Sequence, residues 1–476
     1  MKWQMICVAA LGCMSGWQSA LADEPGARRP ASGATTKPFL EPGDVGQTTV
    51  APSTEDGPLP IAIRWWGQAC VSIETFWGFT IVVDPFSPTE EIGFPKPNLT
   101  ADLVLVTHEH FDHNAVDTVK GKPVVLRGLT DGGKEWARID HYLDRPPNQP
   151  AAAVFPREEA GNLSPYAVHV LGVGVFHDDQ GGTRRGKNTM FLIETNGVRI
   201  LHCGDLGHVL TPEQVAAIGP VDVLILPVGG TYTIDAAQAM QVVQQLKPRR
   251  FVWPIHFRAA HSTLPLTGVD PFVTQARRAG LLVRRVKGNA IAVASLSNGQ
   301  KPPIGSPAVI VSGWIPERPK PDVERSLLAL RGDRRALIAS LGKVSKKQLD
   351  WKPSDGTHTI RWNFEHTTAR ELGFFSQVYH ALDPAIPVIN WNPAQMPPDY
   401  VPRRPDWDTA EMVRHVQRVG AFTERFSYLL ADTPATMRIE GTRFSIDYLT
   451  ALVMGHYKNH TTKAVRKFTL PDWPKD

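Results

Sequence analysis

Short apolar runs, rich in Val, Ile and Leu and mostly bounded by Gly, Pro, Asn or Asp, recur between Ile61 and about Leu296. Such runs predict β-strands. The predicted strands are Ile61–Ile73, Thr80–Val83, Leu103–Val106, Val124–Leu126, Ala167–Phe176, Met190–Glu194, Val198–Leu201, Val221–Val228, Phe251–Ile255 and Ala290–Leu296. Helix-start signals at Thr211 and Asp235 place helices among the later strands. Because strands cluster early and late, with helices expected in both halves, the pattern favours two packed sheets flanked by helices.

Beyond Asp322 the apolar positions change to a spacing of three and four residues, which predicts amphipathic helices. The predicted helices are Val323–Gly342, Thr359–Leu382, Thr409–Leu430 and Ser445–Lys467. Helices of this length within about 150 residues predict an antiparallel four-helix bundle. The expected fold class is therefore α/β plus all-α, with a Pro-rich linker between the two parts.

The first residues have the pattern of a secretory signal peptide: Lys2, an apolar run from Trp3 to about Trp17, and the small-residue site Ala20-Leu21-Ala22. A lipid anchor at Cys13 is the lesser alternative. We therefore expect an exported protein, periplasmic or secreted, and no stable membrane span in the mature chain. The predicted segments are a signal peptide at 1–22, a flexible lead-in at 23–58, the α/β domain at 59–297, a linker at 298–321 and the bundle at 322–470.

Composition excludes some classes of protein. Of the 476 residues, 42% are hydrophobic and 21% charged, which is typical of globular proteins. The net charge of +4 comes without a long basic block, so nucleic-acid binding is not favoured. Outside the signal peptide only Cys70 and Cys203 remain, which favours two buried thiols and leaves one bridge between them open. The oligomeric state is not predicted.

The chemistry is concentrated in THEHFDH, Thr107 to His113, directly after the apolar run Leu103–Val106. His108 and His110 are two residues apart, so an extended segment points both side chains the same way. Asp112 and His113 follow where the chain leaves the strand. This segment can therefore offer two imidazoles to one cation, and a carboxylate plus an imidazole to a second. In a chain with 16 His, a chance match is expected only about 0.001 times, which disfavours solvated or capping histidines.

Three further side chains stand at predicted strand ends and could complete the site: His177, Asp205 and His256. Each alone is weak evidence, because a single His at a strand end is more often a satisfied surface or core group. Together, imidazole and carboxylate ligands suit two Zn²⁺ ions, with Mn²⁺ or Fe²⁺ as alternatives.

At this point the sequence resembles the metallo-β-lactamase superfamily. The residues that carry the resemblance are THEHFDH, His177, Gly204-Asp205 and Pro254-Ile255-His256, and the marks of its ascorbate-phosphate-lactonase-like (UlaG-like) branch are Trp66-Gly67-Gln68, Asp84-Pro85 and Pro227-Val228-Gly229-Gly230. The resemblance implies an αββα sandwich. It also implies that His108, His110 and His177 hold the first metal, that Asp112, His113 and His256 hold the second, and that Asp205 bridges both. Gln68 departs from the branch, which usually has His there.

The site and the resemblance together predict hydrolysis of an ester, lactone or phosphodiester by a metal-bridging hydroxide, with Asp112 as the proton-transferring residue. The substrate is expected to be a small molecule. Arg184, Arg185 and Lys187 follow His177 and could bind an anionic substrate, although a solvated loop is an equal alternative. The rival function is a non-catalytic, metal-dependent binding or scaffold protein that uses the bundle as its ligand-binding module.

The bundle carries a second histidine group. His456 and His460 lie four residues apart on one predicted helix, and His366 lies within another. With Trp362 to His366 and Gly455-His456, this arrangement resembles the DinB-like bundles. The resemblance implies that the three imidazoles bind one divalent cation, and the alternative is a metal-free bundle in which they only pack.

Overall fold

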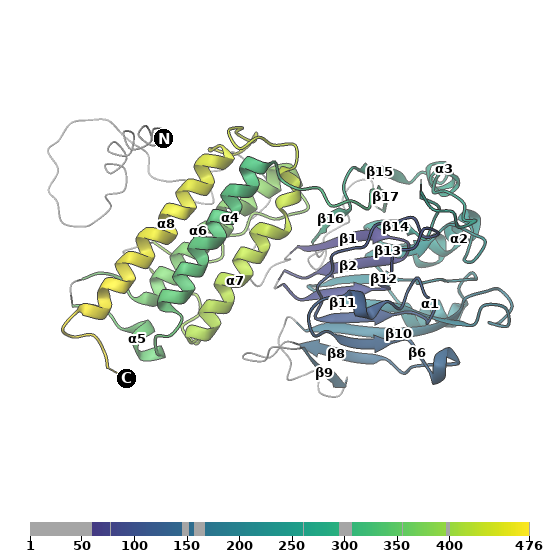
Figure 1. The fold of residues 1–476 in the computed structure, drawn as a ribbon, viewed down its shortest axis with the longest axis horizontal. Coiled ribbons are helices and arrows are strands. Elements are labelled where there is room, and N and C mark those ends of the chain that lie inside the picture. Colours follow the sequence, from purple (N-terminus) through teal and green to yellow (C-terminus); the bar gives the residue numbers. More distant parts are fainter. Residues whose placement is uncertain are drawn as a thin grey trace, which may run out of the picture. The chain divides into compact units, whose positions relative to one another are not determined.

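A computed structural model describes residues 60–475 except 77, 145–151, 157–166, 260, 295–306, 355 and 397–399 (Figure 1). The predicted signal peptide at 1–22 and the lead-in at 23–58 lie outside the described residues, as does the first part of the predicted linker. In the part of the chain that is described, no helix is both long and apolar enough to cross a membrane.

The first sheet of the α/β domain has six strands among the described residues, in the order β16-β1-β2-β3-β4-β5. Their bounds are β1 Ile61–Gly67, β2 Cys70–Glu74, β3 Thr80–Val83, β4 Leu103–Val106, β5 Val124–Arg127 and β16 Ala290–Val293. The single run predicted at Ile61–Ile73 is two antiparallel strands, because the chain reverses at Gly67 and Gln68, both with positive φ. The four residues of β4 are all buried, and this strand leads directly into Thr107.

The second sheet has nine described strands in the order β15-β17-β14-β13-β12-β11-β10-β8-β9. Their bounds are β8 Asp140–Asp144, β9 Ala153–Pro156, β10 Val168–Phe176, β11 Lys187–Thr195, β12 Val198–His202, β13 Val223–Pro227, β14 Phe251–Ile255, β15 Leu282–Val286 and β17 Ala308–Ser312. A small ribbon joins β6, Leu129–Thr130, to β7, Glu135–Trp136. Apolar residues of the two large sheets form one continuous core.

The helices of the α/β domain lie against strands of the nine-stranded sheet. They are α1 Pro212–Ile218 on β10, α2 Ala236–Leu246 on β13 and α3 Asp270–Arg278 on β15. The predicted helix starts at Thr211 and Asp235 are confirmed, since their side chains cap the N-termini of α1 and α2. The expectation of helices in both halves is wrong for the first half: before β12 the described residues form only 3₁₀ turns, at Val116–Thr118 and Asp131–Gly133.

The predicted linker at 298–321 contains a core strand, so this prediction needs correction. β17 lies between β14 and β15 in the nine-stranded sheet, with Ala308 to Val311 buried. Its sequence, AVIVS, is apolar and β-branched like the other strands, but the prolines on both sides concealed it. The α/β domain therefore extends to Ser312.

The C-terminal part is helical, as predicted. Its elements are α4 Pro321–Leu341, α5 Lys346–Asp350, α6 Ile360–Leu382, α7 Thr409–Arg425 and α8 Ile446–Arg466. Helices α4 and α6 each contact both α7 and α8, so the four long helices described there close into a bundle. Helix α6 is buried on nearly all sides. The fold class, α/β plus all-α, is confirmed.

Candidate metal centre

Seven side chains from four strand ends meet in one place. His108, His110, Asp112 and His113 follow β4, His177 follows β10, Asp205 follows β12 and His256 follows β14. Asp205 lies at the centre of this cluster. Its Oδ2 atom is 3.2 Å from Nε2 of His177, 3.3 Å from Nε2 of both His113 and His256, and 3.9 Å from Nε2 of His108.

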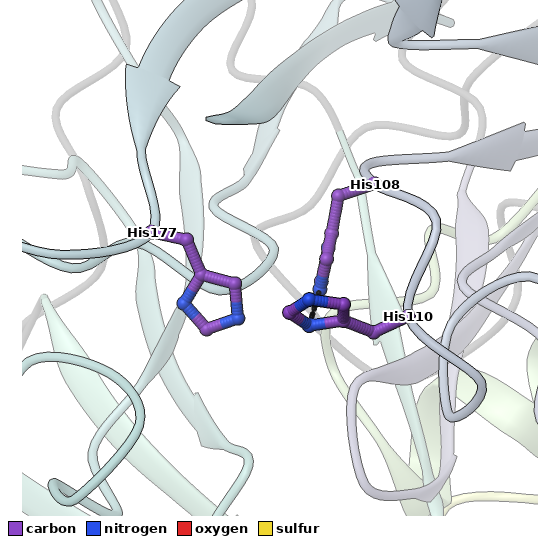
Figure 2. Close-up of side chains that lie close together, drawn as sticks. All are labelled: His108, His110 and His177. Carbon is purple, nitrogen blue, oxygen red and sulfur yellow. Dashed lines mark hydrogen bonds between the residues drawn. The ribbon is translucent and has the colours of Figure 1, made fainter. Parts of the chain in front are cut away.

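The ligand-type atoms form groups small enough to enclose a cation. One group is His108, His110 and His177, whose rings lie close together (Figure 2). A second is Asp112, His113 and His256, and a third, His108, His113 and Asp205, connects the two. Within each group the ligand atoms lie within 4.8 Å of one another. The arrangement can therefore hold metal, and the Asp205 carboxylate lies beside imidazoles of both histidine groups.

The turn that carries Asp205 is held by Asn188. The Asn188 amide donates to the Cys203 carbonyl at 2.9 Å, and its Oδ1 accepts the Asp205 N–H at 3.2 Å. Gly204 lies between them with φ of +53°, and a Cβ there would be 2.5 Å from Asn188 Oδ1 and 2.8 Å from the Thr107 side chain. Only glycine fits this approach, so the Gly204-Asp205 pair has a steric cause.

Asp84, after β3, sets the orientation of two histidines. Its carboxylate accepts the Thr107 N–H and hydroxyl, both at 2.8 Å, and lies 2.9 Å from His113 Nδ1. Because the Thr107 hydroxyl donates to Asp84, its oxygen is free to accept from His108 Nδ1 at 3.0 Å. Nδ1 of each histidine is thereby held by an acceptor, so Nε2 is the nitrogen that faces the cluster and is available for a metal. Sequence reasoning did not assign this role to Asp84, although the Asp84-Pro85 pair at a strand end was a signal.

Burial and neighbouring charges tune the ionisation of the cluster. Burial, reinforced by His113, lowers the pKa of His108 well below its usual value, and burial with His177 lowers the pKa of His110. Burial raises the pKa of Asp205, but His113 and His256 outweigh it and hold the pKa well below the usual range. For His113, burial lowers the pKa, but the carboxylates of Asp205, Asp112 and Asp84 outweigh it and hold the pKa well above the usual value. Because metal is bound by neutral imidazole and ionised carboxylate, His113 must release a proton when a cation binds.

Several buried polar atoms of the cluster have no hydrogen-bond partner among the described residues. They are His113 Nε2, His177 Nδ1, Asp205 Oδ1, His256 Nδ1 and Gln68 Oε1. Buried polar atoms are normally paired, so orphaned ones concentrated among ligand-type residues fit a site built for ions. The residues present therefore suit the divalent cations that the donor set implies.

One side of the cluster reaches the surface. His110 is exposed, and Phe111 has 53% of its surface exposed, whereas His108 and His113 are buried. A cavity of about 520 Å³ adjoins the motif and is lined by Glu109, Asn114, Arg127 and residues 129–133. None of the seven side chains of the cluster lines this cavity, so the exposed His110 is what marks the side of the cluster that faces solvent.

Two of the three basic residues predicted to bind substrate have side-chain partners in the structure. Arg185 donates to the Thr231 carbonyl and lies over the Tyr232 ring, while Lys187 pairs with Glu135 and lies over Trp136. The backbone N–H groups of Arg184 and Arg185 donate to the Asp178 carboxylate, which closes this loop. Their role toward substrate stays a prediction.

In the bundle, His366 of α6 lies against His456 and His460 of α8, with ring centroids 5.6 and 4.9 Å away. His456 Nδ1 is 2.9 Å from the Leu452 carbonyl and His460 Nδ1 is 2.9 Å from Asn363 Oδ1. Both acceptors fix the proton on Nδ1 and leave Nε2 unprotonated. Burial lowers the pKa of all three rings, reinforced by His460 at His366, and that of His460 falls to about 3. These neutral rings suit a cation, but they are not among the groups of described residues whose ligand atoms all lie within 4.8 Å of one another.

Comparisons with known proteins agree with both halves of the structure. The family model described as the β-lactamase superfamily domain matches residues 62–256, and that of the DinB superfamily matches residues 282–462. A UPF0173 metal-dependent hydrolase from Thermococcus onnurineus is 30% identical over 216 residues, which are 44% of this chain and 89% of the relative. Another from Sulfurisphaera tokodaii is 28% identical over 225 residues, 46% of this chain and 92% of the relative.

Among solved structures, one from Thermotoga maritima, described as a Zn-dependent hydrolase of the metallo-β-lactamase superfamily, is 32% identical. The match covers 53% of this chain and 98% of that one, with a TM-score of 0.36. With its strand-end histidine cluster, this chain belongs to the UPF0173 metal-dependent hydrolases of the metallo-β-lactamase superfamily and carries a second domain of the DinB superfamily.

Proposed function

We propose that the α/β domain is a dinuclear hydrolase, of the ascorbate-phosphate-lactonase-like branch, that cleaves an ester, lactone or phosphodiester bond. The observation that carries the proposal is the position of Asp205, whose Oδ2 lies within 3.2 to 3.9 Å of imidazole nitrogens from both histidine groups. Mixed imidazole and carboxylate ligands favour two Zn²⁺, with Mn²⁺ or Fe²⁺ as alternatives.

Two bound cations would supply Lewis acidity and lower the pKa of water to about 7. The protein's own residues then orient and move protons. Asp84 orients His113, and Thr107 orients His108, so that the Nε2 atom of each ring faces the cluster. Asp112 stays ionised, because His113 outweighs the effect of burial and lowers its pKa, so its carboxylate can accept a proton from the nucleophile. The exposed side at His110 and Phe111 admits the substrate.

We further propose that the substrate is a small, anionic molecule met outside the cytoplasm. The support is the signal-peptide pattern at 1–22 and the basic residues Arg184, Arg185 and Lys187 after β10. On this proposal the metal is acquired after export, since a chain that crosses the membrane unfolded cannot carry a preformed site.

The test combines metal analysis with turnover. The metal-loaded protein is assayed against generic esters, lactones and bis(p-nitrophenyl) phosphate, beside Asp112→Ala and the exposed control Asp117→Ala. At least two metals per chain and turnover that only Asp112→Ala abolishes support the proposal. Full metal occupancy without turnover on the whole panel would instead favour the binding or scaffold function.

We also propose that His366, His456 and His460 bind one divalent cation in the bundle. The observation in favour is that two of these rings have Nδ1 fixed by an acceptor, which leaves Nε2 available. Such a site would leave a coordination position open for a ligand of the bundle.

A further inference from the structure

The Gln68 side chain contacts the group formed by Asp112, His113 and His256, although Gln68 lies outside the THEHFDH motif. It is 1% exposed and follows β1 with φ of +49°. Its carbonyl accepts from the Trp65 indole N–H at 2.9 Å and from the His256 N–H at 3.1 Å. His256 also has φ of +49°. Two non-glycine residues in the left-handed region are therefore tied together, which is typical of functional sites.

The side chain of Gln68 occupies a position that a ligand would take. Its amide nitrogen is 2.9 Å from Asp112 Oδ2 and 2.8 Å from His256 Nε2. Ligand atoms that share one cation at about 2.1 Å lie about 3.0 to 3.4 Å from each other. The terminal atoms of Gln68 thus lie beside the two other ligand atoms at nearly the separation expected of neighbours in one coordination shell.

The present hydrogen bonds cannot persist when a cation is bound. The Gln68 N–H groups use the lone pairs of Asp112 and His256 that a cation would take, and an N–H dipole aimed at a cation is repulsive. The amide can turn over, since rotation about its last bond is soft. Its Oε1, which is buried and has no partner among the described residues, would then face the ion. The bond to the ion would offset the cost of leaving the NH₂ group buried in the place that Oε1 now occupies.

We propose that Gln68 is a ligand of the second metal position, where its amide oxygen joins Asp112, His113 and His256. This inference rests on the dinuclear function proposed above. An added neutral oxygen makes this ligand set harder than Asp112, His113 and His256 without it, so it favours Mn²⁺ or Fe²⁺ relative to Zn²⁺ at this position.

The experiment measures binding of the second equivalent of Mn²⁺ to the full chain, by counting free Mn²⁺ with electron paramagnetic resonance. Gln68→Leu keeps the volume and removes the oxygen, Gln68→Glu supplies a charged oxygen, and Gln241→Leu on the exposed face of α2 is the matched control. We expect Gln68→Leu to weaken the second equivalent 10- to 100-fold, and Gln68→Glu and the control to retain it.

A spectroscopic arm separates ligation from mere support of the fold. Mn²⁺-loaded protein labelled with ¹³C at the glutamine side-chain carbonyl should show electron–nuclear coupling that Gln68→Leu loses. Two equivalents with unchanged affinity in Gln68→Leu, or no such coupling, would overturn the role of Gln68 and leave the dinuclear proposal standing. A wild-type chain that binds one equivalent would overturn both, and one that gains a second only in Gln68→Leu would show that Gln68 blocks the position.

Discussion

The carboxylate of Asp84 orients two histidines of the cluster: it contacts His113 directly and His108 through the Thr107 hydroxyl. Asp84→Asn places an NH₂ group against His113 Nδ1–H or against Thr107, so at least one donor loses its acceptor. We expect the affinity for the cations to fall about 10- to 100-fold, because partners that orient a ligating His contribute that much.

The measurement for Asp84→Asn is metal content after dialysis against graded chelator, followed by a titration with the same metal. Asp117→Asn, an exposed carboxylate of the 3₁₀ turn that follows the motif, is the control. Wild-type affinity in Asp84→Asn would contradict the orienting role.

Among single residues, the seven ligand candidates could be chosen from the sequence. Few His and Asp residues stand at predicted strand ends, and THEHFDH places four of the candidates within six residues. It did not allow Asp84, Asn188 or Gln68 to be assigned their contacts. Asp84 meets His113 across 29 positions and Gln68 meets His256 across 188. Contacts of that separation depend on the packing of two sheets, which no local pattern encodes.

Among the elements, β17 tests how far the α/β domain extends. Ile310 is fully buried in this strand, whereas Ile315, five residues later, is 64% exposed. Ile310→Ala should lower the free energy of unfolding by about 2 to 5 kcal/mol, since it removes core methylenes and leaves a cavity. Ile315→Ala should change it by less than about 0.5 kcal/mol. Urea unfolding of both variants makes the comparison, and equal, small effects would restore the linker interpretation of 298–321.

Helix α7 carries a buried histidine that should make the bundle sensitive to acid. His415 is stacked on Trp391 at 4.1 Å, and neither of its ring nitrogens has a hydrogen-bond partner among the described residues. Burial, together with Arg418 and Arg404, holds its pKa well below the usual value. The folded state therefore keeps the ring neutral where the unfolded state protonates it.

It follows that the unfolded state binds the extra proton below about pH 6.5, so the free energy of unfolding falls as the pH falls from there toward the folded pKa. His415 contributes up to about 1.4 kcal/mol per pH unit to this slope. His415→Phe keeps a ring against Trp391 but cannot titrate. Its urea unfolding at pH 7, 6 and 5 should show a shallower slope than wild type, and identical slopes would exclude His415 as the source.

Elements were predictable where the apolar pattern was long and regular. The four bundle helices lie within a few residues of their predicted starts, and β4 and β14 have the predicted bounds. The chain reversal at Gly67 and Gln68 was missed because the run is apolar on both sides of it. Strand β15 was missed because its sequence, LVRRV, alternates poorly and three of its five residues are exposed or nearly so.

For the whole molecule, two histidine clusters in different domains can be distinguished by counting metal ions. The first combines five histidines with two carboxylates, Asp112 and Asp205, from four strand ends, whereas the second has imidazoles alone from α6 and α8. A site without a carboxylate leaves the charge of a cation uncompensated, so the bundle should bind its ion more weakly and release it first to a chelator.

We therefore expect three equivalents of divalent metal in the wild-type chain at saturation. His366→Gln should lose one of them and retain hydrolytic turnover, because the remaining two belong to the α/β domain. Asp205→Asn should instead lose turnover and lower the content of the other pair. His380→Gln, a histidine of the same helix outside the cluster, is the control for α6. Elemental analysis over graded chelator concentrations gives the count, and a wild-type chain that binds only two equivalents, both insensitive to His366→Gln, would leave the three bundle histidines as packing residues.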